Sequence, residues 1–154
     1  MVRMLLKTLA YEQQDTLLPS KWEIEHIFPQ KWQINYFPDV PDSIIKEKIE
    51  HIGNKLPFEK KLNIVAGNGY FAKKKKEYAA SKIAITNAMG ISDVRDWNMD
   101  SIMKRDIRIS DEVIKILNRW NNEYLNIPVK EREVEEPSEE DLARIEEFKK
   151  KGWI

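Results

Sequence analysis

The chain has no cysteine, and histidine is nearly as scarce, with two residues in 154. Without cysteine there are no disulfide bonds, no cysteine-ligated zinc and no thiol nucleophile, and two histidines alone do not make a structural zinc site. Long apolar runs are also missing, so the sequence shows neither a signal peptide nor a membrane span. We therefore expect a cytoplasmic protein with no membrane partner, of a length that suits one domain.

Charge is balanced overall but unevenly distributed. The formal net charge is zero, with 26 basic and 26 acidic residues. Residues 55–82 carry eight lysines against two acids, whereas residues 131–141 carry seven acids against one arginine. This separation is typical of a chain with one anion-facing surface and a solvated acidic segment elsewhere.

The spacing of apolar residues predicts a mainly helical α+β fold. Two short segments alternate apolar and polar residues and predict strands, and Pro57 confines the second strand to a sheet edge. The rest follows helical periodicity, with Trp97 and Trp120 expected in the core. The expected strands are residues 22–28 and 54–61, and the expected helices are residues 3–14, 42–53, 70–88, 97–120 and a last one that begins at Ser138.

One stretch places two ionisable groups at the end of an expected strand, where Glu25 and His26 precede Pro29. Side chains at a strand end are held by the core yet open to solvent, which suits acids, bases and metal ligands. Two more polar residues stand out by context, Asn54 after a glycine at a helix exit and Asn63 nine positions later. Taken alone, a histidine beside an apolar run is more often structural than catalytic.

The sequence resembles the HNH nuclease superfamily, which has a ββα-metal fold, in four ordered segments: Glu25-His26-Ile27-Phe28-Pro29, Gly53-Asn54-Lys55-Leu56, Leu62-Asn63, and Phe71 with its lysine run. It more closely resembles the HNH-type C-terminal domain of GmrSD-type, modification-dependent restriction endonucleases, and this likeness extends through Trp97, Ile102 and Arg105. The resemblance implies a small ββα hairpin-helix core surrounded by helices. It also implies a nuclease domain over residues 1–126, with a motif core at 22–88 and supporting helices at 1–14 and 97–121, before an acidic linker and C-terminal helix at 127–154.

The resemblance implies a role for each motif residue. His26 would be the general base that takes a proton from the attacking water. Asn54 would tie the loop between the strands to the backbone, and Asn63 would supply an amide oxygen to a metal. Glu25 stands where the superfamily has a carboxylate metal ligand.

Oxygen ligands such as these favour one hard cation, Mg²⁺ or Mn²⁺. In a regular strand, however, neighbouring side chains point to opposite faces. Either the strand twists or bulges before Pro29, or Glu25 or His26 lies outside the site.

His51 and the lysine run each have two interpretations. His51 is either an additional metal ligand or a histidine that interacts with free carbonyls at a helix end. The run Lys73, Lys74, Lys75 and Lys76 is either a solvated helix face or a contact for DNA phosphates. Since four consecutive lysines cannot all point one way, Lys74 and Lys75 are favoured for phosphate contacts.

The resemblance implies a divalent-metal-dependent DNA endonuclease or nickase that acts in defence against foreign DNA. Larger enzymes of this kind carry a separate N-terminal, nucleotide-dependent recognition domain, which nothing in this sequence resembles. Two alternatives stay open. One is a catalytically inactive nucleic-acid-binding module of the same fold, and the other is a toxin-like nuclease that prefers RNA.

Overall fold

The computed structural model describes residues 1–33, 37 and 39–125. The chain divides into two compact units, Met1–Trp120 and Asn121–Ile154. The linker and last helix expected at 127–154 lie outside the described residues. The elements, in chain order, are α1 (Val2–Tyr11), β1 (Trp22–His26), α2 (Asp42–Ile49), the 3-10 turn η2 (Ile52–Asn54), β2 (Lys55–Glu59), α3 (Lys60–Ala66), α4 (Phe71–Ala79), α5 (Ala84–Ile91) and α6 (Met99–Leu125).

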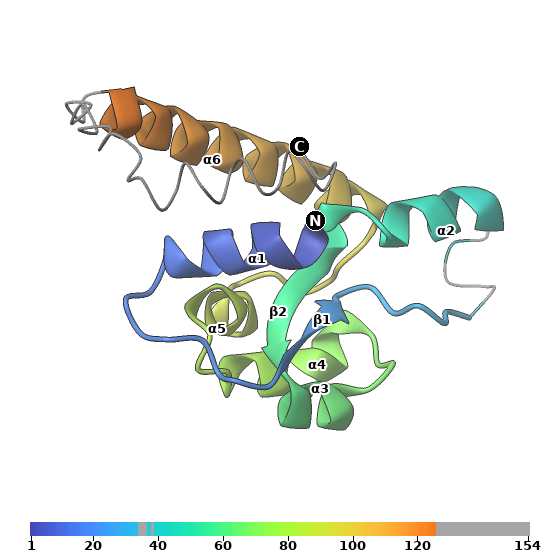
Figure 1. Ribbon diagram of the computed structural model, residues 1–154. Coiled ribbons are helices and arrows are strands. Elements are labelled where there is room, and N and C mark those ends of the chain that lie inside the picture. The colour runs from blue at the N-terminus through green and yellow to red at the C-terminus, as the bar shows by residue number, and fades with distance from the viewer. Residues whose placement is uncertain (34–36, 38, 126–154) are drawn as a thin grey trace, which may run out of the picture. The chain divides into compact units, whose positions relative to one another are not determined.

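A two-stranded antiparallel sheet lies at the centre of the first unit (Figure 1). The strands β1 and β2 pair so that Trp22 lies opposite Glu59 and His26 lies opposite Lys55. The chain then enters α3 directly, which produces a strand–strand–helix succession. The fold class is thus a mainly helical α+β fold, as the sequence predicts.

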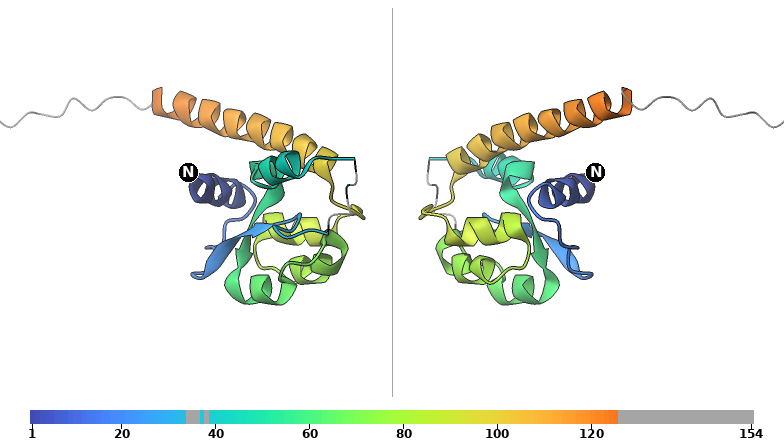
Figure 2. Two further views of the ribbon diagram at one scale, coloured as in Figure 1. Left: turned by 90° about the vertical axis from the view of Figure 1, so that its right-hand side faces the viewer. Right: turned by 90° about the vertical axis from the view of Figure 1, so that its left-hand side faces the viewer.

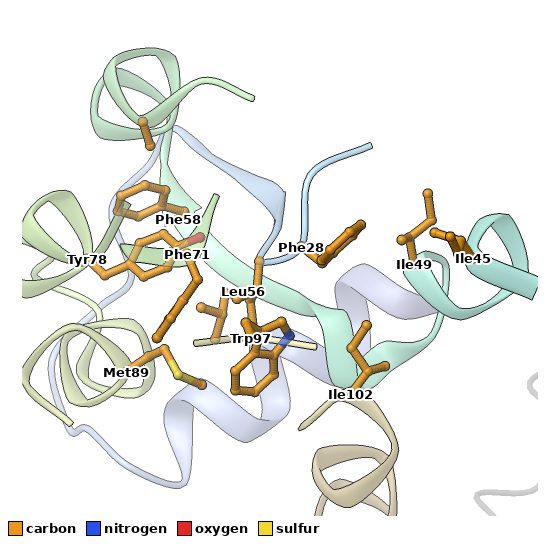
Figure 3. Close-up of a cluster of buried hydrophobic side chains, with 12 residues drawn as sticks. Phe28, Ile45, Ile49, Leu56, Phe58, Phe71, Tyr78, Met89, Trp97 and Ile102 are labelled. Atoms are coloured by element: carbon orange, nitrogen blue, oxygen red, sulfur yellow. The ribbon is translucent and has the colours of Figure 1, made fainter. Parts of the chain in front are cut away.

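The helices that follow α3 cover the hairpin. α4 and α5 pack against each other, and α3 lies beside α4 (Figure 1 and Figure 2). The largest apolar cluster includes Phe58 on β2, Phe71 and Tyr78 on α4, and Trp97 before α6 (Figure 3). The ring centroids of Phe58 and Tyr78 are 5.2 Å apart, and those of Phe71 and Trp97 are 5.7 Å apart. Large aromatic side chains therefore fix α4 to the hairpin.

Gly53 allows α6 to approach the hairpin closely. A Cβ atom at this position would lie 2.2 Å from the carbonyl oxygen of Ile102 on α6. The neighbouring Arg105 side chain is buried and donates to the carbonyl oxygens of Gly53 and Lys55, each at 2.8 Å. Arg105 therefore holds the turn before β2 against α6, at a distance that only glycine at position 53 permits.

Three expectations about the helices need correction. The helix expected over 70–88 is two helices, because Glu59 accepts hydrogen bonds from the Ser81 hydroxyl and from the Lys82 N–H at the break. The helix expected over 42–53 ends at Ile49 and is followed by the 3-10 turn η2. Trp97 is buried as expected, but Trp120 is 45% exposed, because it lies beyond the part of α6 whose apolar residues pack on the core.

Candidate active site

A cavity of about 210 Å³ opens at the end of β1 and is lined by residues from separate parts of the chain. Glu25 and His26 come from β1, and Asn63 comes from α3. Gln30, Asn68 from the loop after α3, and Lys74 from α4 add further polar groups to the lining. Although Glu25 and His26 are neighbours in a strand, both line this cavity, because it lies at the strand end where the chain leaves the sheet.

The His26 side chain is 17% exposed and lies 3.4 Å from Glu50, measured from Nε2 to Oε1. Its Nε2 atom is buried and makes no hydrogen bond within the described residues. Nδ1 also has no hydrogen-bond partner within the described residues, but unlike Nε2 it is accessible to solvent. Burial lowers the pKa of His26 below its ordinary value of 6.5, and the nearby Glu50 carboxylate partly opposes that effect. The imidazole is therefore favoured in its neutral form, which is the form that can accept a proton.

Glu25 is buried between β1 and α4. Its Oε1 atom accepts hydrogen bonds from Lys74 Nζ at 2.6 Å and from the Tyr78 hydroxyl at 2.7 Å. The same ammonium donates to the carbonyl oxygen of His26 at 2.6 Å. Burial lowers the pKa of Lys74 and raises the pKa of Tyr78, while Glu25 opposes the shift of Lys74 by favouring its charged form. Lys74 therefore neutralises Glu25 and fixes the backbone at His26.

Asn54 connects η2 to the segment after β1. Its Oδ1 atom accepts from the Phe28 N–H at 2.7 Å, and its Nδ2 atom donates to the carbonyl oxygens of Phe28 and Ile49. The Ile27 N–H also donates to the carbonyl of Asn54 at 2.9 Å. Asn54 is fully buried. Its amide thus satisfies backbone groups on both sides of the turn and holds the loop that follows His26 in place.

Asn63 lies on α3, and its Nδ2 atom donates to Glu23 at 3.4 Å. Within the described residues, neither Asn63 Oδ1 nor Glu25 Oε2 has a hydrogen-bond partner. Two unpaired oxygen atoms thus belong to residues that line one cavity, which fits a hard cation with water completing its shell. Across the described part of the chain, no three His, Asp or Glu side chains cluster in a way that could hold a metal.

His51 does not line this cavity. Its Nδ1 atom lies 2.6 Å from Oδ2 of Asp106 on α6, and Asp106 also accepts from the Gly53 N–H at 2.6 Å. Its Nε2 atom is 3.8 Å from Glu47, one turn earlier. The structure therefore places His51 in a contact between η2 and α6 and apart from His26, Glu25 and Asn63.

The four lysines of α4 separate into two kinds. Lys74 is 1% exposed and belongs to the cavity, and Lys75 donates to the carbonyl oxygens of Ser92 and Val94. Lys73 and Lys76 are exposed. The two lysines that sequence favoured for phosphate contacts are thus the two with internal partners, and the surface lysines of α4 are Lys73 and Lys76.

The sequence did not indicate that Glu50 and Lys55 lie beside His26, or that the Lys74 side chain is buried. A signal for Lys74 exists, because it lies three residues after Phe71 and four before Tyr78, on the stripe that faces the core. No comparable signal marks Glu50, which is one of several acids near the end of α2.

The side chain of Asn68, which lies between two glycines, holds the loop after β1. It accepts from the Lys31 N–H and donates to the Lys31 carbonyl, as Asn54 does with Phe28. The hydroxyl of Tyr70 accepts from the Gln33 N–H at 2.9 Å. Side chains from η2 and from the loop after α3 thus fix successive parts of one segment that borders the cavity.

Comparisons with known proteins identify the family. The model of the C-terminal domain of GmrSD restriction endonucleases matches residues 1–112, which include the hairpin, the cavity and most of the core. No curated protein and no solved structure matches the chain. In the described part of the chain, no helix combines the length and apolar character needed to cross a bilayer. A domain of this kind implies nuclease activity and suggests a divalent metal ion. The chain belongs to the family of GmrSD restriction endonuclease C-terminal domains.

Proposed function

We propose that this domain is a divalent-metal-dependent DNA endonuclease or nickase with His26 as the general base. The observation that carries the proposal is the meeting of His26, Glu25 and Asn63 at one cavity. These residues come from β1 and α3, which the hairpin brings together. Family membership supplies the nuclease class, and the cavity supplies the residues for the chemistry.

His26 activates the nucleophile in the proposed reaction. Its accessible Nδ1 atom takes a proton from water as the water oxygen forms a bond to phosphorus. The bond between phosphorus and the leaving sugar oxygen then breaks. Lowering of the pKa of His26 by burial keeps the imidazole neutral at pH 7, so that the lone pair is available.

Glu25 and Asn63 would hold the cation through Oε2 and Oδ1, their unpaired oxygen atoms in the described structure. When bound, Mg²⁺ or Mn²⁺ supplies positive charge to the phosphate and the leaving oxygen. Lys74 reduces the negative charge that Glu25 offers, because its ammonium already contacts that carboxylate at 2.6 Å. Asn54 would take no part in the chemical step and would only hold the loop after His26 in position.

The exposed lysines of α4, Lys73 and Lys76, would contact the DNA backbone, since phosphate contacts position a duplex without reading its sequence. Lys74 and Lys75 would support this surface from within through their internal contacts. In the proposed biological role, the domain cleaves foreign DNA in the cytoplasm, and a separate nucleotide-dependent domain selects the substrate.

Cleavage of supercoiled plasmid in Mg²⁺ or Mn²⁺ tests the proposal. We expect the wild type to nick or linearise the plasmid, and H26A to be at least about 100-fold slower, as is usual when a general base is lost. H51A is the matched control, because it removes the other histidine, which lies outside the cavity.

Equal rates for H26A and the wild type would remove His26 from the mechanism. A parallel digest of RNA distinguishes a nuclease that prefers RNA. Salt-sensitive DNA binding without cleavage in either metal would identify an inactive binding module.

A further inference from the structure

The imidazole of His26 has one nitrogen that the proposed reaction does not use. Nε2 is buried, and within the described residues it has no hydrogen-bond partner. An N–H group buried in this way normally finds an acceptor, since leaving it unpaired costs the full desolvation of the group. The nearest carboxylate oxygen is Oε1 of Glu50, at 3.4 Å, which is within ion-pair distance but longer than a good hydrogen bond.

Glu50, which follows α2, is itself held in place by Lys55 on β2. Lys55 Nζ donates to Oε2 of Glu50 at 2.7 Å and to the Glu50 carbonyl oxygen at 2.6 Å. Lys55 is buried, and it is the cross-strand neighbour of His26 in the hairpin. Two contacts from one ammonium thus fix both the backbone and the side chain of Glu50, and they leave Oε1 directed to the imidazole.

We propose that Glu50 is a positioning residue for His26. Its carboxylate accepts a hydrogen bond from the Nε2–H group, which keeps the proton on Nε2 and leaves the Nδ1 lone pair for the reaction. The inference rests on the proposed function, because it assumes that His26 is the base. A carboxylate that orients a histidine through its other nitrogen is a recurrent arrangement in active sites. In the free protein such contacts are commonly long and shorten when substrate binds.

No other acid competes for this role in the described structure. Glu25 precedes His26 but is committed to Lys74 and Tyr78 on α4. Glu47 lies one turn before His51 and is 3.8 Å from that imidazole. Among the described carboxylates, Glu50 alone has an oxygen within 4.0 Å of an imidazole nitrogen of His26.

The tautomer of His26 gives a direct test that needs no activity. Nitrogen-15 NMR of the imidazole at pH 8 should show the Nε2–H form in the wild type. In E50A the buried Nε2 loses its acceptor, so the Nδ1–H form should increase several-fold. E50Q keeps an amide oxygen and should retain the Nε2–H form, whereas E50D withdraws the carboxylate and should behave like E50A.

Kinetics of plasmid cleavage supply the second readout. E50A and E50D should lower kcat by about 10- to 100-fold with KM unchanged, and E50Q should recover part of that loss. E47A is the matched control, because Glu47 is a nearby exposed acid on α2 whose imidazole contact is with His51 and not with His26. The Glu50 side chain is 56% exposed and Lys55 keeps its contact with the carbonyl oxygen of residue 50 in each variant, so the Glu50 variants should fold.

The outcomes separate the two ideas. If H26A is inactive while E50A and E50D keep the wild-type tautomer and kcat, the role of Glu50 is refuted and the base stands. If H26A is fully active, the proposed function fails, and the tautomer experiment still shows whether Glu50 orients the ring.

Discussion

The burial of His26 has a consequence for stability as well as for chemistry. Its pKa lies below 6.5 in the folded state, with burial as the main cause. Below pH 6.5 the unfolded chain binds this proton more readily than the folded chain, so the free energy of unfolding decreases as the pH falls towards the folded pKa. The decrease is at most about 1.4 kcal/mol per pH unit for one group.

We therefore predict that urea unfolding at pH 7.5 and pH 5.0 will show a larger loss of stability for the wild type than for H26Q. Equal losses for the wild type and H26Q would show that His26 titrates alike in both states.

Asn54 should matter more for stability than its small size indicates. N54A removes the partner of three backbone groups, of Phe28 and of Ile49, at a fully buried position. Each unsatisfied buried group costs about 1–3 kcal/mol, with some recovery from water, so a total loss of about 2–4 kcal/mol is expected in urea unfolding. N68A removes a similar two-bond clamp on Lys31 at an exposed position. It should cost about 1 kcal/mol or less, and an equal cost for both variants would contradict the argument.

At the level of single residues, position relative to strand ends and a glycine singled out His26, Asn54 and Asn63. The structure brings His26 and Asn63 to one cavity, whereas Asn54 holds the loop after His26. Glu50 could not be found in this way, because its proposed role rests on the Lys55 contact and on a distance of 3.4 Å to His26, which only the folded chain creates.

Between elements, one buried ion pair joins β1 to α4. Lys74 and Glu25 are 1% and 5% exposed, and their charged atoms are 2.6 Å apart. Removing one partner of such a pair leaves an uncompensated buried charge, which typically costs about 3–5 kcal/mol. We therefore predict that K74M unfolds at a much lower urea concentration than the wild type.

Two variants make that prediction specific. K73M changes the exposed neighbour and should alter stability by less than about 0.5 kcal/mol. The double variant with E25Q added to K74M should recover part of the loss, because a neutral amide can still accept from Tyr78. If K74M and K73M behave alike, the ion pair does not hold α4 to β1.

Periodicity predicted the two strands and α1, α2, α4 and α6, but it did not predict α3, did not separate α5 from α4, and did not fix the ends of the elements. The strand pair and the helix that includes Phe71 follow clear periodicities. The break between α4 and α5 arises because Glu59, more than 20 residues earlier, binds the Ser81 hydroxyl and the Lys82 N–H. Local spacing carries no information about such a distant partner, so one long helix was expected where two occur.

For the whole molecule, the hydrophobic clusters identify the part that should fold alone. Their described members all lie between Val2 and Ile116, and the family match ends at residue 112. The first compact unit ends at Trp120. We therefore predict that a chain that ends at Leu125 folds by itself.

Residues 126–154 should instead influence DNA binding through charge. They contain six of the 26 basic and nine of the 26 acidic residues, so a chain that ends at Leu125 has 20 basic against 17 acidic residues and a net charge of +3. A more positive chain attracts DNA more strongly at low salt, and screening weakens this effect as salt rises.

The shortened chain should therefore bind a DNA duplex several-fold more tightly at 50 mM salt, with the difference reduced at 200 mM. Its midpoint of urea unfolding should equal that of the wild type. A full-length chain with the seven acids between Glu131 and Asp141 changed to amides has 26 basic against 19 acidic residues, a net charge of +7, and should bind at least as tightly as the shortened chain. Unchanged affinity in both proteins would exclude an electrostatic effect of this segment, and a lowered midpoint would show that the first unit depends on it.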